Sequence, residues 1–237
     1  MNCRGCGQER ALIKAHIIPR SFYMELRAEQ PHLSVISSVP GERQKRSNTG
    51  DYDAEILCAE CDQHLGRLDD YGKRVLLDDA CEFSPIAKQG EVAGWFIEGA
   101  DPVRLEKFFL AVLWRASLTA RDFFSRVRLG PYEDELKDYL WSGDDSHPAF
   151  GCTVARFDPS QQIERLEKTV RSPDRFRYEQ MNFYRVYLGG YMVWARVDRR
   201  VTDKLITRVE LGPGRRCVVI RRPFDSSKEF ESMLRAV

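Results

Sequence analysis

Two Cys-x-x-Cys pairs constrain the fold of this chain more than any other feature of its sequence. Cys3 and Cys6 form the first pair, and Cys58 and Cys61 form the second. Together they offer four thiolates, the ligand set of a closed structural zinc site with no open position for chemistry. The 51 residues between the pairs exceed the spacing of a compact zinc ribbon, so a substantial insertion has to leave the site and return. We expect one structural Zn²⁺ bound by all four cysteines.

Two other interpretations of these cysteines stay open, namely a redox Cys-x-x-Cys and incidental thiols. Neither pair follows the strand-to-helix pattern of a thioredoxin-like motif, which favours zinc. The chain has seven cysteines, and an odd number in an intracellular protein is more typical of metal ligands plus spare thiols than of a disulfide framework. Cys81, Cys152 and Cys217 stand apart from the pairs and are predicted to be buried apolar residues.

Composition sets broad limits on architecture and location. The 237 residues form one large domain or two small ones, and a hydrophobic content of 43% is sufficient for a real core. The net charge is only +1, so the chain has no overall excess of positive charge of the kind that would indicate a nucleic-acid partner. No apolar run approaches the roughly 20 residues of a membrane span, and a Cys-x-x-Cys at residue 3 leaves no apolar signal peptide. We expect a cytoplasmic protein without membrane association.

His16 stands between the two cysteine pairs. The stretch "ALIKAHII" has strand composition and ends at Pro19, so the histidine is predicted near the end of a strand. After Cys61, leucines and valine recur at helical spacing, and Asp62 opens this helix as a cap or as a ligand. Asp69 lies about two turns further along the same face. A carboxylate-lined groove is therefore expected to face His16.

The order Cys-x-x-Cys, "AHIIP", then "LCAECD" resembles the HNH (ββα-metal) endonuclease superfamily, in the branch whose hairpin and helix are held by a four-cysteine zinc. The resemblance covers roughly residues 1–80. It implies that His16 is the general base that activates water and that Asp62 binds a catalytic Mg²⁺ or Mn²⁺. The whole chain also looks like uncharacterised bacterial proteins that share "HIIP…LC..C" and a helix near "WRAS", which would fit a phage-defence setting.

Three positions depart from the pattern of that superfamily. Many members have an acid where this chain has Ala15, an asparagine where it has Asp62, and a ligand where it has Gly66. The carboxylate of Asp62 is an acceptable hard ligand for Mg²⁺ or Mn²⁺, whereas Ala15 and Gly66 leave the site short of ligands. Three nearby residues are candidates to complete it, with helix geometry favouring the first: Asp69, Asp53 and His64.

The residue types suit phosphodiester hydrolysis, which needs an activated water and stabilisation of the leaving oxygen. A histidine between apolar residues is also commonly a satisfied core residue, and Asp69 is equally compatible with a solvated helix face. We therefore keep two functions: a metal-dependent nuclease, and a non-catalytic zinc module that binds nucleic acid or protein. A zinc deaminase is disfavoured because its H-x-E motif is absent: Ile17 and Ile18 follow His16.

The remaining sequence predicts an α+β body over residues 81–237, following the zinc-stapled ββα module at 1–80. A short helix is expected over 20–29, and a helical segment over about 101–142 begins with a buried helix that Trp114 and Arg115 anchor to the module. A basic antiparallel sheet is expected over about 149–222, with a hairpin at Gly189-Gly190, and a short helix closes the chain.

Two basic regions are candidates for nucleic-acid contact, with DNA favoured over RNA. Residues 41–53 are predicted to form a polar loop that carries Arg43, Lys45 and Arg46, and the sheet region carries Arg199 and Arg200. Arginines and aromatic residues interleaved on a sheet can bind phosphates and stack bases. A charged, solvated surface explains the same residues without any partner.

Overall fold

The computed structural model describes residues 1–27, 33–36, 45–47, 50–162, 166–200 and 204–234. The α-helices are α1 (Arg20–Arg27), α2 (Ala59–Leu76), α3 (Pro102–Leu118), α4 (Tyr132–Trp141), α5 (Lys204–Val209) and α6 (Lys228–Leu234), with 3₁₀ turns at Asp122–Phe124 and Leu166–Lys168. The strands are β1 (Ala15–His16), β2 (Leu33–Ile36), β3 (Lys45–Ser47), β4 (Tyr52–Asp53), β5 (Phe83–Lys88), β6 (Glu91–Ile97), β7 (Phe150–Phe157), β8 (Val170–Tyr178), β9 (Met181–Leu188), β10 (Tyr191–Val197) and β11 (Cys217–Arg222). The predicted α+β class is confirmed.

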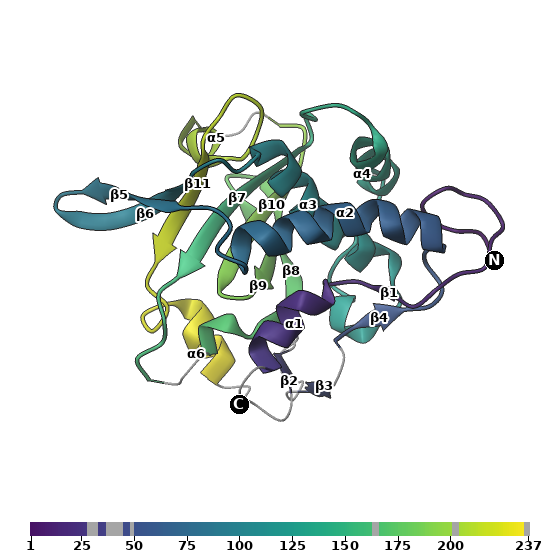
Figure 1. The fold of residues 1–237 in the computed structure, drawn as a ribbon, viewed down its shortest axis with the longest axis horizontal. Coiled ribbons are helices and arrows are strands. Elements are labelled where there is room, and N and C mark those ends of the chain that lie inside the picture. The colour runs from purple at the N-terminus through teal and green to yellow at the C-terminus, as the bar shows by residue number, and fades with distance from the viewer. Residues whose placement is uncertain (28–32, 37–44, 48–49, 163–165, 201–203, 235–237) are drawn as a thin grey trace.

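One large sheet organises the molecule, in the order β3-β2-β8-β9-β10-β7-β11-β6-β5 (Figure 1). The expectation of a purely antiparallel sheet is wrong, because β11 pairs with β7 in parallel and β2 pairs with β8 in parallel. The predicted hairpin at Gly189-Gly190 is confirmed between β9 and β10, and both glycines have positive φ, as a tight hairpin turn requires. Helix α3 contacts β7, β9 and β10, whereas α5 contacts β7 and β11.

Helix α3 is the centre of the main core, as its apolar pattern predicts. Asp101 caps its first turn by accepting hydrogen bonds from the backbone N–H groups of Val103 and Arg104. Residues from Leu105 to Ser117 are then buried continuously. Helix α2 packs closely on α3 at Gly72, where a Cβ would come within 2.6 Å of the Phe108 ring. This close approach fixes the position of α2 relative to the body.

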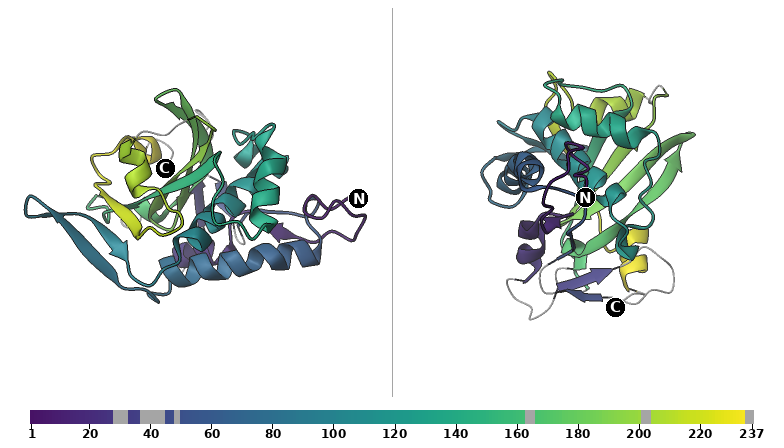
Figure 2. Two further views of the ribbon diagram at one scale, coloured as in Figure 1. Left: turned by 90° about the horizontal axis from the view of Figure 1, so that it is seen from above. Right: turned by 90° about the vertical axis from the view of Figure 1, so that its right-hand side faces the viewer.

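A second, two-stranded antiparallel sheet joins β1 to β4, with Ala15 opposite Asp53 and His16 opposite Tyr52. Helix α2 follows β4 in the chain and runs along the outside of the molecule (Figures 1 and 2). The order of these elements is strand, strand, helix. The strand ending near His16 is confirmed, although it is only two residues long because Pro19 and the start of α1 follow directly.

Several segments differ from the sequence-based expectations. The polar loop predicted over 41–53 contains two strands, and β3 pairs with β2 so that Lys45 and Arg46 lie in a strand. The helix predicted over 20–29 is described as far as Arg27. Strand β8 and the hairpin of β5 and β6 had no prediction; the hairpin projects from the body (Figure 2). Arg43 lies outside the described residues.

Residues from both predicted modules share one core. Ile17, Leu65 and Val75 from the first 80 residues belong to the same buried cluster as Phe109 and Val193 from the remainder. The division near residue 80 itself stays a prediction. Among the helices of the described segments, none is long and apolar enough to cross a membrane.

Candidate metal centre and the adjoining histidine site

The four cysteines predicted to bind zinc come together. Their sulfur atoms all lie within 4.8 Å of one another, and three of the four cysteines are buried. Four convergent thiolates match the donor set and the closed geometry that zinc prefers in structural sites. We searched the described residues for groups of at least three histidine, cysteine or acidic side chains that lie close enough to bind one ion. The search found this one group.

Local backbone geometry explains why the cysteines converge. Cys58 is the N-cap of α2 with an extended backbone, so both members of its pair project from the first turn of that helix. Gly5 lies against this turn, where a Cβ would come within 2.7 Å of the Cys61 sulfur. Gly7 has a φ of +72° and closes the first knuckle by donating its N–H to the Cys3 carbonyl at 2.8 Å.

The surrounding hydrogen bonds favour negative charge on sulfur. The backbone N–H of Cys58 donates to the Cys3 sulfur at 3.3 Å. Burial opposes ionisation of Cys3, but backbone hydrogen bonds from residues 58, 6 and 5 outweigh it and lower the pKa of this thiol to about 7. Burial and the neighbouring sulfurs raise the pKa of Cys61. Four crowded sulfurs cannot all ionise without a cation, so the cluster fits a metal ion.

His16 lies on β1 and Asp62 lies on α2. His16 is half-buried on β1, and its ring meets the Tyr52 ring edge-on at 6.3 Å between centroids. Asp62 is half-buried in the first turn of α2. Burial raises the pKa of the Asp62 carboxyl, and Asp69 adds to this, whereas Arg115 and His16 lower it. The four groups therefore share one electrostatic environment.

Asp62 is not the helix cap. The interpretation of Asp62 as an N-cap is wrong, because Cys58 occupies that position and the N–H of Asp62 already donates to the Cys58 carbonyl at 3.0 Å. The sequence pattern predicted that the helix starts after the second Cys-x-x-Cys. In the structure it starts at Ala59, between the two cysteines of that pair. The carboxyl of Asp62 is thus left available for an interaction other than capping.

Asp69 has a partner from the body of the protein. Arg115 of α3 donates to both of its carboxylate oxygens, each at 2.7 Å. The Arg115 side chain is only 1% exposed, and its Nε has no hydrogen-bond partner among the described residues. The predicted role of Arg115 as an anchor to the amino-terminal module is confirmed. Both carboxylate oxygens of Asp69 accept a hydrogen bond from Arg115. Trp114 instead contacts α4, donating to the Glu133 carbonyl in the first turn of that helix at 3.1 Å.

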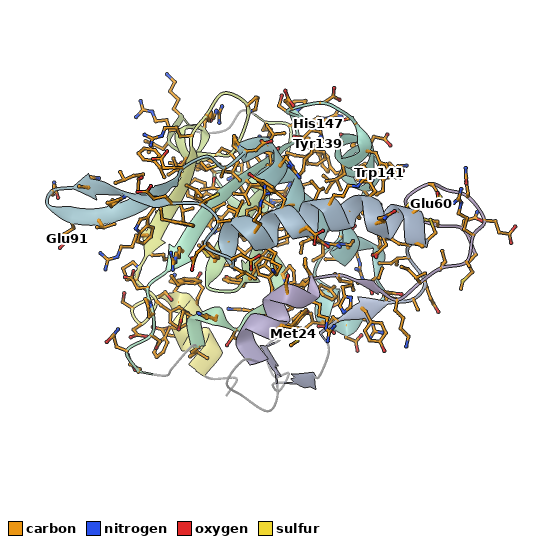
Figure 3. The ribbon with its side chains drawn as sticks, in the orientation of Figure 1. Met24, Glu60, Glu91, Tyr139, Trp141 and His147 are labelled. Carbon is orange, nitrogen blue, oxygen red and sulfur yellow. The ribbon has the colours of Figure 1, made fainter. Side chains whose placement is uncertain are left out.

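The other two residues considered as additional metal ligands are also engaged. Asp53 accepts a hydrogen bond from the Thr119 hydroxyl at 2.6 Å and another from the backbone of Glu55 at 2.9 Å. His64 lies 3.3 Å from the Leu140 carbonyl and stacks on Trp141 at 4.9 Å between ring centroids. Figure 3 labels Trp141 near the end of α2 that carries the cysteines. Asp62 is the remaining carboxylate of the predicted set.

A basic patch that sequence reasoning missed adjoins His16. Tyr52 lies beneath two exposed cations, with the Lys14 ammonium 5.4 Å and the Arg121 guanidinium 5.2 Å from the centre of its ring. Lys14 was visible from the sequence because it lies two residues before His16. Arg121 was not, because only the fold brings the end of α3 to β4.

The arginines predicted to bind nucleic acid on the sheet have acidic partners. Arg199 forms an ion pair with Glu135 at 2.7 Å, and Arg200 forms one with Asp198 at 2.5 Å. Hydrogen bonds from Arg200 lower the pKa of Asp198 strongly, so this carboxylate stays charged near neutral pH. The charges of the two arginines are therefore partly neutralised, although both side chains are more than half exposed.

Comparisons with protein-family models, with curated proteins and with solved structures found no match to this chain.

Proposed function

We propose that the protein is a metal-dependent nuclease that hydrolyses phosphodiester bonds, with His16 as general base. One observation carries the proposal: a strand pair and a helix, joined at a four-cysteine cluster, place a half-buried histidine in the electrostatic field of a carboxylate. The resemblance of "AHIIP" and "LCAECD" to HNH endonucleases supports the same assignment of roles.

Each residue has a specific role in this proposal. His16 accepts the proton of the attacking water, and its ring lies beside the half-buried ring of Tyr52. Asp62 would hold a Mg²⁺ or Mn²⁺ ion, which when bound stabilises charge on the phosphate oxygens. A single carboxylate suffices in principle, because Mg²⁺ is commonly bound by one or two carboxylates together with waters and substrate phosphates.

Asp69 and Arg115 act as a positioning pair. Their paired charges cancel, so Asp62 supplies the net negative charge beside His16. Two unpaired carboxylates on one face of α2 would raise each other's pKa and favour a protonated Asp62. The buried guanidinium of Arg115 lowers the pKa of Asp62 and so opposes this effect, although burial still raises that pKa.

DNA is the preferred substrate class in the proposal, and the basic patch of Lys14, Tyr52 and Arg121 is its contact surface. The two cations lie over the Tyr52 ring and can attract the phosphates of a bound strand. The patch adjoins His16, so a strand bound there passes the general base.

The second candidate function is a zinc module that binds nucleic acid without cutting it. This alternative is favoured by the engagement of Asp69, Asp53 and His64 with other partners, which leaves one carboxylate for the divalent metal. The basic patch would serve binding in the same way.

Gly66 offers a test that separates the two functions. A Cβ at Gly66 would have nothing within 4 Å, so a side chain fits there without a clash, and residues 62 and 66 lie on one face of α2. We expect the wild type to nick supercoiled plasmid in Mg²⁺ or Mn²⁺ and to stop in chelator. Gly66→Asp should lower the metal concentration that gives half-maximal cleavage by about tenfold or more, because it adds a second carboxylate ligand.

Gly66→Ala is the matched control for that test. It should raise stability by about 0.5–1 kcal/mol through helix propensity, without changing the metal response. A wild type and Gly66→Asp variant that both bind DNA but cut nothing in either metal would favour the binding module.

The basic patch predicts a difference in salt dependence. Lys14→Ala together with Arg121→Ala should weaken DNA binding across sequences and lower the slope of log K against log salt by about 1–2, because each phosphate contact releases counterions. Arg199→Ala together with Arg200→Ala should change the slope less, since acidic partners already neutralise these side chains. Fluorescence anisotropy over a salt series measures both. Equal changes in the two double variants would contradict the assignment.

A further inference from the structure

A glutamate side chain lies buried at the contact between α3 and α4. Glu106 on α3 is only 3% exposed, and its Oε1 accepts a hydrogen bond from the Tyr139 hydroxyl of α4 at 2.9 Å. Tyr139, labelled in Figure 3, is also buried, so water does not reach this bond. A buried carboxyl group that faces a neutral donor is more stable when it is protonated, because a buried charge needs a charged partner or several donors.

The cations near Glu106 are bonded to other groups. Arg196 on β10 donates to the Glu210 carboxylate at 2.9 Å, and it also donates to the backbone carbonyls of residues 148, 150 and 198. Lys107 donates to the Ser142 carbonyl at 3.0 Å. Glu106 and Glu210 are both buried and both interact with the charge of Arg196, but the guanidinium pairs with Glu210.

This arrangement favours the protonated form of Glu106 up to neutral pH. Burial raises the pKa of Glu106 from 4.5 to about 7, and the charge of Glu210 adds to this increase. Three groups lower the pKa without offsetting burial, namely Tyr139, Arg196 and Lys107. A carboxyl group with a pKa near 7 changes its charge within the physiological pH range.

The other titratable side chains at this contact stay neutral near pH 7. Cys152 on β7 interacts with Glu106, and its own burial raises the pKa of the thiol well above the usual range. Burial likewise raises the pKa of Tyr139. The His147 ring lies 5.7 Å from the Tyr139 ring between centroids, and burial lowers the pKa of this histidine. Glu106 is therefore the member of this group whose ionisation adds a buried charge.

Helix α4 also contacts the segment that carries the first cysteine pair. Glu133 in its first turn forms an ion pair with Arg4 at 2.6 Å. At the other end of the helix, Trp141 stacks on His64 of α2. A Cβ at Gly5 would lie 3.2 Å from the Trp141 ring. The position of α4 on α3 thus supports the position of the amino-terminal cysteine segment.

We propose that Glu106 and Tyr139 form a proton-dependent latch that holds α4, and through it the amino-terminal cysteine segment, to the body of the protein. With Glu106 protonated, the buried contact is neutral and the latch is closed. Loss of the proton places a charge in the contact and loosens α4 before α3, because α3 is buried along most of its length whereas α4 is largely solvent-facing. The latch uses neither His16 nor Asp62, so it does not depend on nuclease activity.

The latch predicts a specific pH dependence of folding. Between about pH 4.5 and 7 the unfolded chain carries an ionised Glu106 while the folded protein keeps the proton, so the folded state binds more protons. The stability that Glu106 contributes is therefore present at low pH and is lost as the pH rises through this window.

Glu106→Gln tests this prediction, because the amide still accepts the Tyr139 hydrogen bond but cannot ionise. The folding equilibrium constant of the variant divided by that of the wild type should rise by about 10²-fold from pH 5 to pH 8. Urea unfolding of the full-length proteins measures this ratio, in which the titration of other groups cancels. Asp134→Asn is the matched control on α4, since its side chain is 91% exposed, and its ratio should stay constant.

Hydrogen exchange tests whether α4 is the element that responds. At pH 8, amides of α4 should exchange about 10²-fold faster in the wild type than in Glu106→Gln, and at pH 5 the two proteins should differ by less than about tenfold. Amides of the projecting β5–β6 hairpin should exchange alike in both proteins. A folding ratio that does not change with pH would overturn the proposal. Equal exchange of α4 at pH 8 in the two proteins would overturn it as well.

Discussion

Cys58→Ser is expected to abolish zinc binding and to unfold the segment that carries His16. The purified wild type should contain about one zinc per chain, because its four sulfur atoms converge within 4.8 Å. An ion bound by the four cysteines would hold the amino-terminal loop to the start of α2, and for structural zinc sites the free energy of metal binding is folding free energy. We expect a loss of several kcal/mol of stability, measured by chemical unfolding with metal analysis of the same preparation.

The choice of serine makes this result specific to the metal. Cys58 is the N-cap of α2 and makes no side-chain capping bond, whereas serine is among the preferred N-cap residues. The substitution should therefore favour the helix start while removing a metal ligand. Cys81→Ser, at a half-buried cysteine outside the cluster, is the control and should retain zinc. A metal-free wild type that is fully folded would contradict the structural role.

His16→Ala is expected to lower the rate of DNA cleavage by about 10²–10⁴, the range for losing a general base. Zinc content, folding and DNA affinity should stay near those of the wild type. The reason is that His16 is half-buried, lies outside the main core cluster and meets Tyr52 at the edge of its ring. Single-turnover cleavage at saturating protein measures the chemical step directly.

Two further variants show which group acts in that step. Asp62→Asn should also lower cleavage, but higher Mn²⁺ should recover part of the activity because the amide is a weakened ligand; the same addition should not recover His16→Ala. His64→Ala should cut at the wild-type rate, since His64 interacts with Leu140 and Trp141. If His16→Ala loses its fold, the histidine is a core residue and the nuclease proposal loses its base.

The elements that follow local patterns were accessible from sequence. The paired Cys-x-x-Cys motifs determined which four residues converge, because ligand type and spacing are local properties. The apolar periodicity of α3 and its Asp101 cap likewise determined a buried helix, and the Gly189-Gly190 turn determined the β9–β10 hairpin. His16 at the end of a strand was predictable for the same reason.

The tertiary structure alone decided which side chains the site can use. Asp69 and Arg115 are 46 residues apart, and only the packing of α2 on α3 makes them an ion pair. Arg199 similarly has its charge partly neutralised by Glu135, 64 residues away. Sequence patterns report the face of a helix or strand on which a residue lies, but the partner across that face depends on long-range packing. Whether a carboxylate is a free ligand or half of a buried ion pair is therefore set by the fold.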